Sequence, residues 1–174
     1  TGENYGVELT LEKFFHKGYF FMLTSSLYNA TFRGSKGETL NSDFNGNYVL
    51  NILGTKEFRW GNKNNSSIGI GGKVTWAGGR RYTPIDTVAS ALAGQAVYID
   101  SKTNKKRFRD YFRADIKLNY KINTKKITHE IGVDLVNVFG IKNVLRQRYV
   151  GGETPIVEEY QLGFLPAFYY KIDF

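Results

Sequence analysis

The chain contains no cysteine, so neither a disulfide framework nor a thiolate metal site can form. Proline and methionine are also scarce, with three and one residues respectively. No apolar run approaches the ~20 consecutive apolar residues that a membrane-crossing helix requires. A helical membrane protein is therefore not expected, although 41% of the residues are hydrophobic.

Signals of catalysis are equally scarce. His16 and His129 lie far apart and have no companions at ligand spacing, which argues against a metal site. Gly69, Gly71 and Gly72 are followed by no predicted helix, so they do not indicate a phosphate-binding loop. The sequence offers no nucleophile–base arrangement and no paired-carboxylate motif. We therefore expect no enzyme activity, no cofactor and no catalytic residue.

Aromatic residues and glycine are abundant instead. Twelve tyrosines and thirteen phenylalanines help to bring the aromatic content to 16%, and nineteen residues are glycine. Mean hydropathy is nonetheless only −0.37. This combination is typical of transmembrane β-barrels, because their strands alternate apolar with polar residues.

Alternation with a period of two predicts about seven strands. The clearest alternation lies in residues 112–122, where Ile116 and Leu118 are interleaved with Asp115 and Lys117. A face that carries so many charges cannot be a dry protein core. The second strand is ambiguous, because its first residues are apolar on both sides. The predicted strands cover residues 5–14, 19–32, 48–60, 67–77, 112–122, 127–137 and 168–174.

The predicted connections alternate in length. Short turns at residues 16–18, 62–65 and 124–126 alternate with long connections that begin near residues 33, 78 and 138. Up-and-down outer-membrane barrels show this arrangement, with short periplasmic turns and long external loops. Aromatic residues near strand ends, such as Tyr48 and Trp60, fit two interfacial girdles. The sequence thus predicts an all-β fold, an antiparallel up-and-down transmembrane β-barrel.

The alternation also assigns a face to each strand residue. In a transmembrane barrel the apolar side chains face lipid and the polar ones face the lumen. The expected lipid face includes Val7, Leu9, Leu11, Ile70, Val74, Ile116, Leu118, Ile131, Val133, Leu135, Tyr170 and Ile172. The expected lumen face includes Glu8, Glu12, Lys73, Asp115, Lys117, Asn119, Glu130, Asp134 and Lys171.

An odd number of strands leads to a further expectation. Bacterial single-chain barrels have an even number of strands and both ends in the periplasm. About seven strands would place Thr1 outside the cell. We therefore expect residues 1–174 to be part of one β-barrel domain whose N-terminal strands belong to a longer polypeptide.

Four stretches carry a family resemblance. They are GRRYTPID at residues 79–86, DYFRAD at 110–115, the stretch from HE at 129–130 to DLVNVF at 134–139, and EEYQLGFLP at 158–166 followed by YYKIDF at 169–174. In this order they resemble the C-terminal part of TonB-dependent outer-membrane receptors of the Bacteroidetes type. The resemblance spans roughly the second half of the chain.

The resemblance implies a barrel of about 22 strands with an N-terminal plug domain that this chain lacks. It also implies uptake of a scarce nutrient across the bacterial outer membrane, driven by the inner-membrane TonB complex through the missing N-terminal part. Further implied partners are outer-membrane lipid, lipopolysaccharide and the barrel-assembly machinery. That machinery would read Tyr170, Ile172 and Phe174 in the last strand.

The formal net charge of +8 is concentrated in a few clusters. One cluster could meet lipopolysaccharide phosphates, although a solvated loop is the interpretation that we favour. Nucleic acid is not expected as a partner, because no recognition fold surrounds the cluster. Its candidate contacts are Lys105, Lys106, Arg107 and Arg109.

A second basic cluster, formed by Arg80, Arg81 and Tyr82, opens a long connection. Arginine forks suit carboxylate and phosphate groups, so this cluster is a candidate clamp for an anionic part of a substrate. The alternative, which we favour, is that the cluster fixes the base of its loop.

Two other functions fit the same alternation. One is a complete small outer-membrane barrel with a structural or adhesive role, which would need an eighth strand inside a long connection. The other is a soluble β-barrel or sandwich that binds an apolar ligand, with Ile116 inward and Lys117 outward. The alternating loop lengths and the terminal Phe174 favour lipid outside. The sequence does not name the transported substrate.

Overall fold

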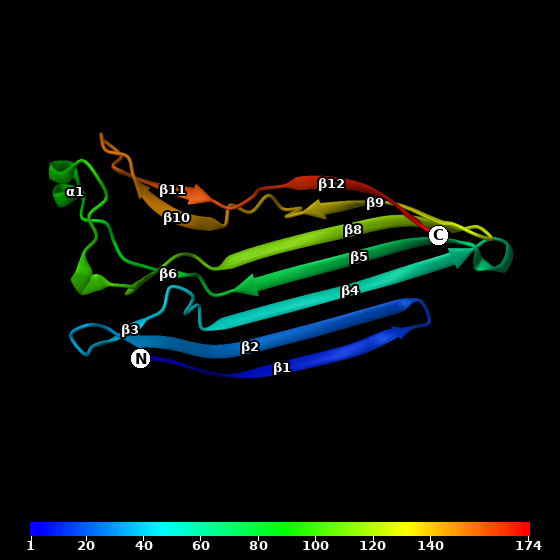
Figure 1. Ribbon diagram of the computed structural model, residues 1–174, viewed down its shortest axis with the longest axis horizontal. Helices are drawn as coiled ribbons and strands as arrows, with labels where there is room; N and C mark the ends of the chain where they lie inside the picture. The colour runs from blue at the N-terminus through cyan, green and yellow to red at the C-terminus, as the bar shows by residue number, and fades with distance from the viewer.

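The computed structural model describes residues 1–174, apart from the side chain of Asn64. Strands account for 61% of the residues and helices for 7%, which confirms the all-β prediction. One large antiparallel sheet dominates the molecule (Figure 1), with the strand order β1-β2-β4-β5-β8-β9-β12. Its strands are β1 (Gly2–His16), β2 (Tyr19–Arg33), β4 (Tyr48–Trp60), β5 (Ser66–Ala77), β8 (Tyr111–Asn123), β9 (Thr128–Val136) and β12 (Leu165–Asp173).

These long strands are the ones that the alternation predicts, and only their ends differ. The largest differences are at the edges of the sheet, where β1 begins at Gly2 and β12 begins at Leu165. Both strands extend beyond the alternating run because pairing with a neighbour continues, as between Gly2 and Phe32. Pro166 hides the start of β12 in the sequence, yet an edge strand tolerates proline.

All the long connections lie at one end of the sheet, as Figure 1 shows. Short turns join β1 to β2, β4 to β5 through η1 (Asn62–Asn64), and β8 to β9. Residues 34–47, 78–110 and 137–164 form the long connections at the opposite end. We call these connections the first, second and third loops, and together the loop layer. The predicted alternation of short and long connections is confirmed.

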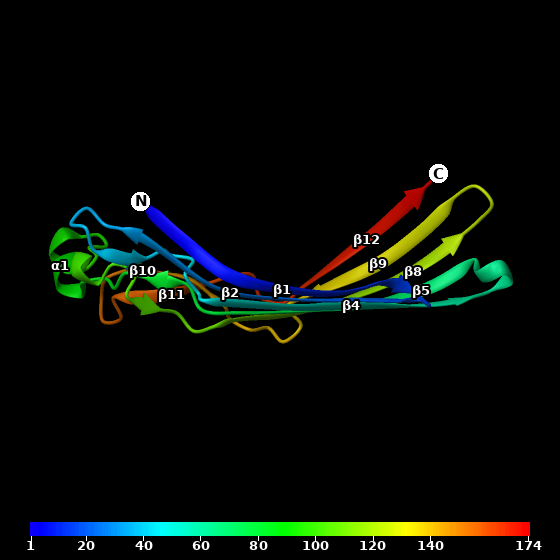
Figure 2. The same ribbon diagram turned by 90° about the horizontal axis from the view of Figure 1, so that it is seen from below.

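The sheet is twisted and open. The N-terminal end of β1 and the C-terminal end of β12 both rise from the plane of the central strands (Figure 2). A twist of one hand is intrinsic to strands of L-residues. Each of these two strands pairs with one neighbour along the sheet, so the sheet has two free edges. The chain therefore forms an antiparallel up-and-down sheet that does not close on itself.

The strand register gives the sheet one apolar and one polar face. Val7 is 74% exposed and Ile131 is 57% exposed, and both lie on the apolar face. A contiguous apolar surface of this kind marks a contact with lipid or with other protein. Two adjacent rows illustrate the two faces: Ile70, Leu118, Val133 and Phe168 are apolar, and Gly71, Lys117, Asp134 and Ala167 lie on the polar face.

The register also settles the ambiguous second strand. Leu23 pairs with Leu11 and with Ile52, which places it on the apolar face. Phe20 and Met22 consequently lie on the polar face, because successive side chains of a strand point to opposite sides.

The loops contain short elements that the sequence analysis treated as plain connections. Strands of two to six residues offer too few periods for an alternation signal. The α-helix α1 has a usable sequence signal, since Asp86 caps its start and Gly94 ends it at φ +66°. The elements are β3 (Thr39–Asn41), β6 (Arg81–Tyr82), α1 (Thr87–Ala93), η2 (Asp100–Lys102), β7 (Lys106–Arg107), β10 (Val144–Tyr149) and β11 (Ile156–Tyr160).

Burial is concentrated in the loop layer and at its junction with the sheet, and most of it is polar. Among the described residues, the buried hydrophobic side chains are Ile85, Ala114 and Val144. Because the apolar core is so small, the stability of the sheet depends on the hydrogen bonds between its strands and on contacts that cover its two faces. The buried polar residues are Asn45, Ser67, Ser90, Asn104, Asn137 and Asn143.

Candidate functional site

The loop layer brings together the two basic clusters that are separate in the sequence. β6 pairs with β7, so Arg81 lies opposite Arg107 and Tyr82 lies opposite Lys106. Tyr82 also stacks on Phe108, with ring centroids 4.2 Å apart. The candidate substrate clamp and the candidate lipopolysaccharide contact therefore belong to one structural unit.

Arg81 ties the second loop to the first. Its Nε donates to the carbonyl oxygen of Asn45 at 3.0 Å, and a terminal nitrogen donates to Oδ1 of Asn47 at 3.0 Å. Its backbone N–H donates to the carbonyl oxygen of Asp43 at 2.9 Å. These contacts engage the guanidinium at the base of the loop, and they make Arg81 a poor candidate for a ligand contact.

Two asparagines, Asn45 and Asn104, also connect the first loop to the second, although no sequence motif marks them. Asn45 is fully buried, accepts the N–H of Ala30 at 3.0 Å and donates to Oδ1 of Asn41 at 2.7 Å. The side-chain amide of Asn104 donates to the carbonyl oxygen of Asn41 at 2.8 Å and to Asp43 at 2.7 Å. Because buried amides need hydrogen-bond partners, these contacts fix the first and second loops to each other.

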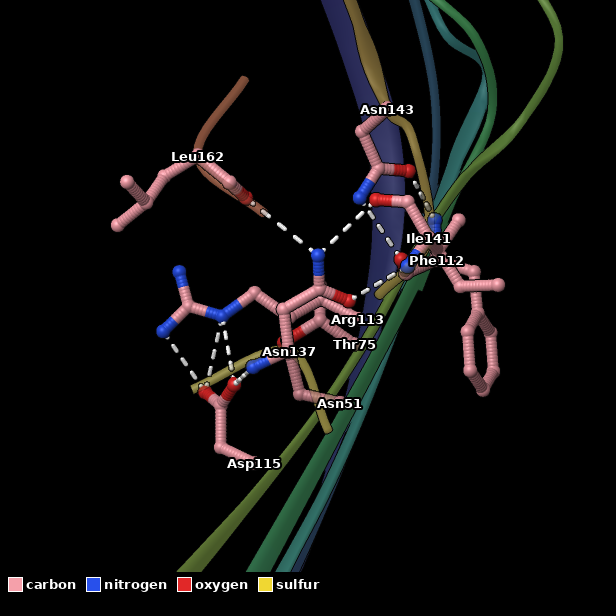
Figure 3. A network of polar contacts seen from close by, with 9 residues as sticks. All are labelled: Asn51, Thr75, Phe112, Arg113, Asp115, Asn137, Ile141, Asn143 and Leu162. Carbon is pink, nitrogen blue, oxygen red and sulfur yellow. Dashed lines mark hydrogen bonds and ion pairs between the residues drawn. The ribbon is translucent and has the colours of Figure 1, made fainter. Parts of the chain in front are cut away.

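Two further asparagines, Asn137 and Asn143, hold the third loop to β8 by hydrogen bonds (Figure 3). Asn137 donates its backbone N–H to Oδ1 of Asp115 at 2.9 Å, and its side-chain amide bonds the backbone of Ile141 as donor and acceptor. Asn143 bonds the N–H and the carbonyl of Phe112 at 3.0 and 2.8 Å, as a neighbouring strand would. The start of the third loop is thus held against the sheet.

The sequence carries a weak signal for these asparagines. Asparagine tolerates the left-handed backbone region better than most residues, and Asn47, Asn104 and Asn137 have φ between 52° and 72°. Asn47 lies just before the predicted strand 48–60 and Asn137 is the last residue of the predicted strand 127–137, which ends at Val136 in the structure, so an asparagine at such a boundary indicates a turn. It does not indicate which distant backbone groups its amide will bond.

All three loops line one hollow of about 320 Å³. Arg80 is the least engaged basic residue of its wall: its guanidinium lies 4.6 Å from the centroid of the Phe44 ring. The buried Nε of Arg80 has no hydrogen-bond partner among the described residues. The lining comprises Asp43 from the first loop, residues 80–83, Ile85, Tyr98, Asn104 and Phe108 from the second, and residues 145–147 from the third.

The basic cluster of the second loop divides into paired and unpaired residues. Arg107 lies 3.3 Å from Oδ1 of Asp110. Arg109 reaches the third loop, where its terminal nitrogen lies 3.4 Å from Oε2 of Glu158. Lys105 and Lys106 are exposed, and within the described part of the chain they are outside the ion pairs. These two lysines are therefore the residues of the cluster that can meet an external anion.

Asp110 connects the end of the second loop to the sheet. It accepts a hydrogen bond from the Tyr48 hydroxyl at 2.5 Å and another from the Gly79 N–H at 3.2 Å. The Tyr48 hydrogen bond lowers the pKa of Asp110 below its ordinary value of 3.8, and the Gly79 N–H and the charge of Arg107 act in the same direction against partial burial. The carboxylate therefore stays ionised at neutral pH.

Ion pairs and hydrogen bonds run across the polar face between β8, β9 and β12. Lys117 lies 3.5 Å from Asp134, and Lys121 lies 3.4 Å from Glu130. Tyr169 donates to Glu130 at 2.9 Å, and the Lys117 ammonium lies 4.6 Å from the centroid of the Tyr169 ring. The Lys117 side chain is half exposed, so its pair adds little stability, whereas Glu130 is largely buried and is bonded to both Lys121 and Tyr169.

The residues of the predicted assembly signal lie at a free edge of the sheet. Tyr170 and Ile172 are on the apolar face of β12, and Phe174 follows the end of the strand and is 96% exposed. The Tyr170 hydroxyl lies 2.8 Å from Nδ1 of His129, so β12 is tied to β9 near its C-terminal end.

The described residues contain no group of three or more histidine, aspartate or glutamate side chains placed to hold a metal ion. Nor does any described helix have the length and apolar content to cross a membrane. Comparisons of the chain with family models, with curated proteins and with solved structures found no match.

Proposed function

We propose that residues 1–174 form part of the wall of an outer-membrane β-barrel, in a TonB-dependent receptor that takes up a nutrient. The observation that carries the proposal is the difference between the two faces of the sheet. One face exposes large apolar side chains from β1 to β12, and the other carries ion pairs across its strands. In a membrane-embedded barrel, lipid around the wall would contact the apolar face, and water in the lumen would contact the polar face.

The positions of the aromatic residues support a membrane-spanning sheet. Phe112 lies near the loop end of β8 and Tyr120 near its turn end, both on the apolar face. At about 3.3 Å per residue they are ~26 Å apart along the strand, and a barrel tilt of ~35–45° makes this ~20 Å across the membrane, which fits within the ~25 Å apolar band of outer-membrane barrels. Tyr120 stacks with Trp60, and Phe112 lies beside Phe139, so aromatic rings gather at both levels.

The two free edges support membership in a larger barrel. β1 and β12 each pair with one neighbour along the sheet. A long unpaired edge is a template for aggregation unless another strand or a covering element meets it. In the proposed receptor, further strands of the same barrel pair with both edges. The plug and the segment that contacts TonB belong to the rest of the polypeptide.

The ends of the strands receive different roles in the proposed receptor. The loop layer faces the exterior and the short turns face the periplasm. Lys105 and Lys106 meet lipopolysaccharide phosphates at the outer surface. Tyr170, Ile172 and Phe174 serve as the signal for the barrel-assembly machinery. This chain contributes wall and external loops, and transport is a property of the whole receptor.

The accessibility of two inserted epitopes tests the proposal. One epitope is placed at Gly152, between β10 and β11, and the matched control is placed at Lys125, in the short turn between β8 and β9. We expect an antibody to bind the first epitope on intact cells and the second only after the outer membrane is permeabilised. The tagged polypeptide should be several times longer than 174 residues on an immunoblot.

Three outcomes would contradict the proposal. Tagged protein in the soluble fraction would favour a soluble barrel that binds an apolar ligand. Equal labelling of both epitopes on intact cells would overturn the orientation of the loops. A membrane polypeptide no longer than this chain would favour the small complete barrel.

A further inference from the structure

The hollow in the loop layer has the charge and the shape of a ligand site. We propose that it binds a small organic anion with a flat apolar part, such as an aromatic carboxylate or phosphate. That this anion is the transported nutrient rests on the proposed function. The binding itself rests only on the geometry of the hollow.

The charge around the hollow is positive and incompletely compensated. Arg81 is bonded to an amide and a carbonyl, which are neutral groups. Arg146 lies 2.6 Å from Oε2 of Glu159, but Arg148 lies 2.8 Å from the other oxygen of the same carboxylate. One carboxylate therefore balances two guanidinium groups on the third loop. A site with this excess of positive charge favours an anionic ligand.

The acidic residue of the lining does not cancel this excess. Asp43 contributes one carboxylate, and its Oδ1 already accepts a hydrogen bond from Asn104 at 2.7 Å. Against it stand Arg80, Arg81 and Arg146. The described lining is therefore still positive after Asp43 is counted.

Arg80 provides the least engaged guanidinium of the wall. Its side chain takes part in none of the hydrogen bonds or ion pairs of the described residues, and its Nε is enclosed without a partner. The terminal nitrogens are not enclosed in this way, so they are the donors that a carboxylate or phosphate oxygen in the hollow can reach. The planar guanidinium suits contact with such groups.

An apolar wall accounts for the flat part of the ligand. The stacked rings of Tyr82 and Phe108 line the hollow together with Ile85 and Leu145. Aromatic faces favour stacking with another planar group. The volume of about 320 Å³ is at the lower end of the ~300–1,000 Å³ range of ligand pockets, so the ligand is about the size of a single ring with an acidic group.

Calorimetric titration of the purified full-length receptor with phenyl phosphate and with benzoate tests the inference, and benzyl alcohol is the neutral analogue. We expect saturable binding of at least one anion, weakening as salt is added, and no binding of benzyl alcohol. Arg80→Gln should weaken the binding about tenfold or more, because a hydrogen bond to a charged group is lost.

Arg148→Gln is the matched control. Arg148 bonds the same carboxylate as Arg146, but only Arg146 lines the hollow. Arg148→Gln removes only a charge outside the lining and should weaken the binding less than Arg146→Gln, which also removes a group of the wall. If Arg80→Gln fails to fold, the comparison of Arg146→Gln with Arg148→Gln still tests the anion site. These side chains are 66% and 60% exposed respectively, so their replacement should not prevent folding.

The inference is overturned if neither anion binds, if benzyl alcohol binds equally well, or if Arg148→Gln weakens binding as much as Arg146→Gln. A receptor that is correctly placed in the outer membrane but shows any of these results refutes only the anion site. Specific anion binding by a protein from the soluble fraction refutes only the proposed function.

Discussion

Single residues decide how closely side chains pack on the polar face. Gly132 pairs across the sheet with Tyr169, whose ring lies over it. A Cβ at Gly132 would lie 2.5 Å from Cζ of that ring. The missing side chain therefore gives Tyr169 the room to bond Glu130 and to contact Lys117.

Gly132→Ala should lower the free energy of unfolding by about 1–3 kcal/mol, because the added methyl group overpacks against Tyr169. Gly72→Ala is the matched control, since its Cβ would meet no atom closer than the carbonyl oxygen of Asp115 at 3.9 Å. The control should be neutral or slightly stabilising. Urea unfolding of the receptor in lipid vesicles measures both, and equal effects would show that Tyr169 does not need this space.

The sequence places Gly132 and Tyr169 on the same face as Lys117, but it does not pair them. Their pairing depends on the register between β9 and β12, which the third loop separates. A shift by one residue would turn every side chain of β12 to the other face, so alternation restricts the register without fixing it. The contact of the Tyr169 ring with Gly132 therefore could not be predicted from the sequence.

At the scale of elements, β8 carries the contrast between the two faces in consecutive residues. Ile116 pairs with Leu135 on the apolar face, and Lys117 pairs with Asp134 on the polar face. The alternation that predicts this contrast follows from strand geometry, in which successive side chains point to opposite sides. Strand positions were therefore predictable, whereas the short strands of the loops were not.

Ile116→Arg should destabilise the receptor by about 2–4 kcal/mol if this face meets lipid near the bilayer midplane. Lys117→Ala should cost less than about 1 kcal/mol, because the Lys117 side chain is half exposed and its ion pair with Asp134 is long at 3.5 Å. Folding titrations in lipid vesicles give both values. If Ile116→Arg folds as stably as the parent, the assignment of this face to lipid is wrong.

At the scale of the whole molecule, the loop layer is joined to the sheet by polar contacts that depend on pH. Asp110 accepts hydrogen bonds from Tyr48 and from the Gly79 N–H, and its pKa is lowered below 3.8 mainly by the Tyr48 hydrogen bond. A carboxyl group with a lowered pKa in the folded state stabilises that state above its unfolded-state pKa. The stabilisation disappears as the pH falls below about 3.8 and through the folded-state value.

Limited proteolysis at decreasing pH, with a protease active in acid, should therefore show the second loop opening below about pH 4. Asp110→Asn should make the loop equally susceptible at neutral and at acid pH, because it removes the ionisable group. Asp100→Asn, an exposed carboxylate of the same loop, is the control and should keep the pH dependence of the parent. An unchanged profile in Asp110→Asn would exclude this role for Asp110.

The positions of the long strands, their two faces and the alternation of short and long connections could be predicted from the sequence. These properties are local, because they follow from the period of a strand and from turn residues within a few positions of one another. The pairing of β6 with β7, the joining of the loops by buried asparagines, and the positively charged hollow that all three loops line became visible in the folded molecule alone. Those contacts connect residues far apart in the chain, and their geometry depends on side-chain packing and hydrogen-bond direction rather than on any period in the sequence.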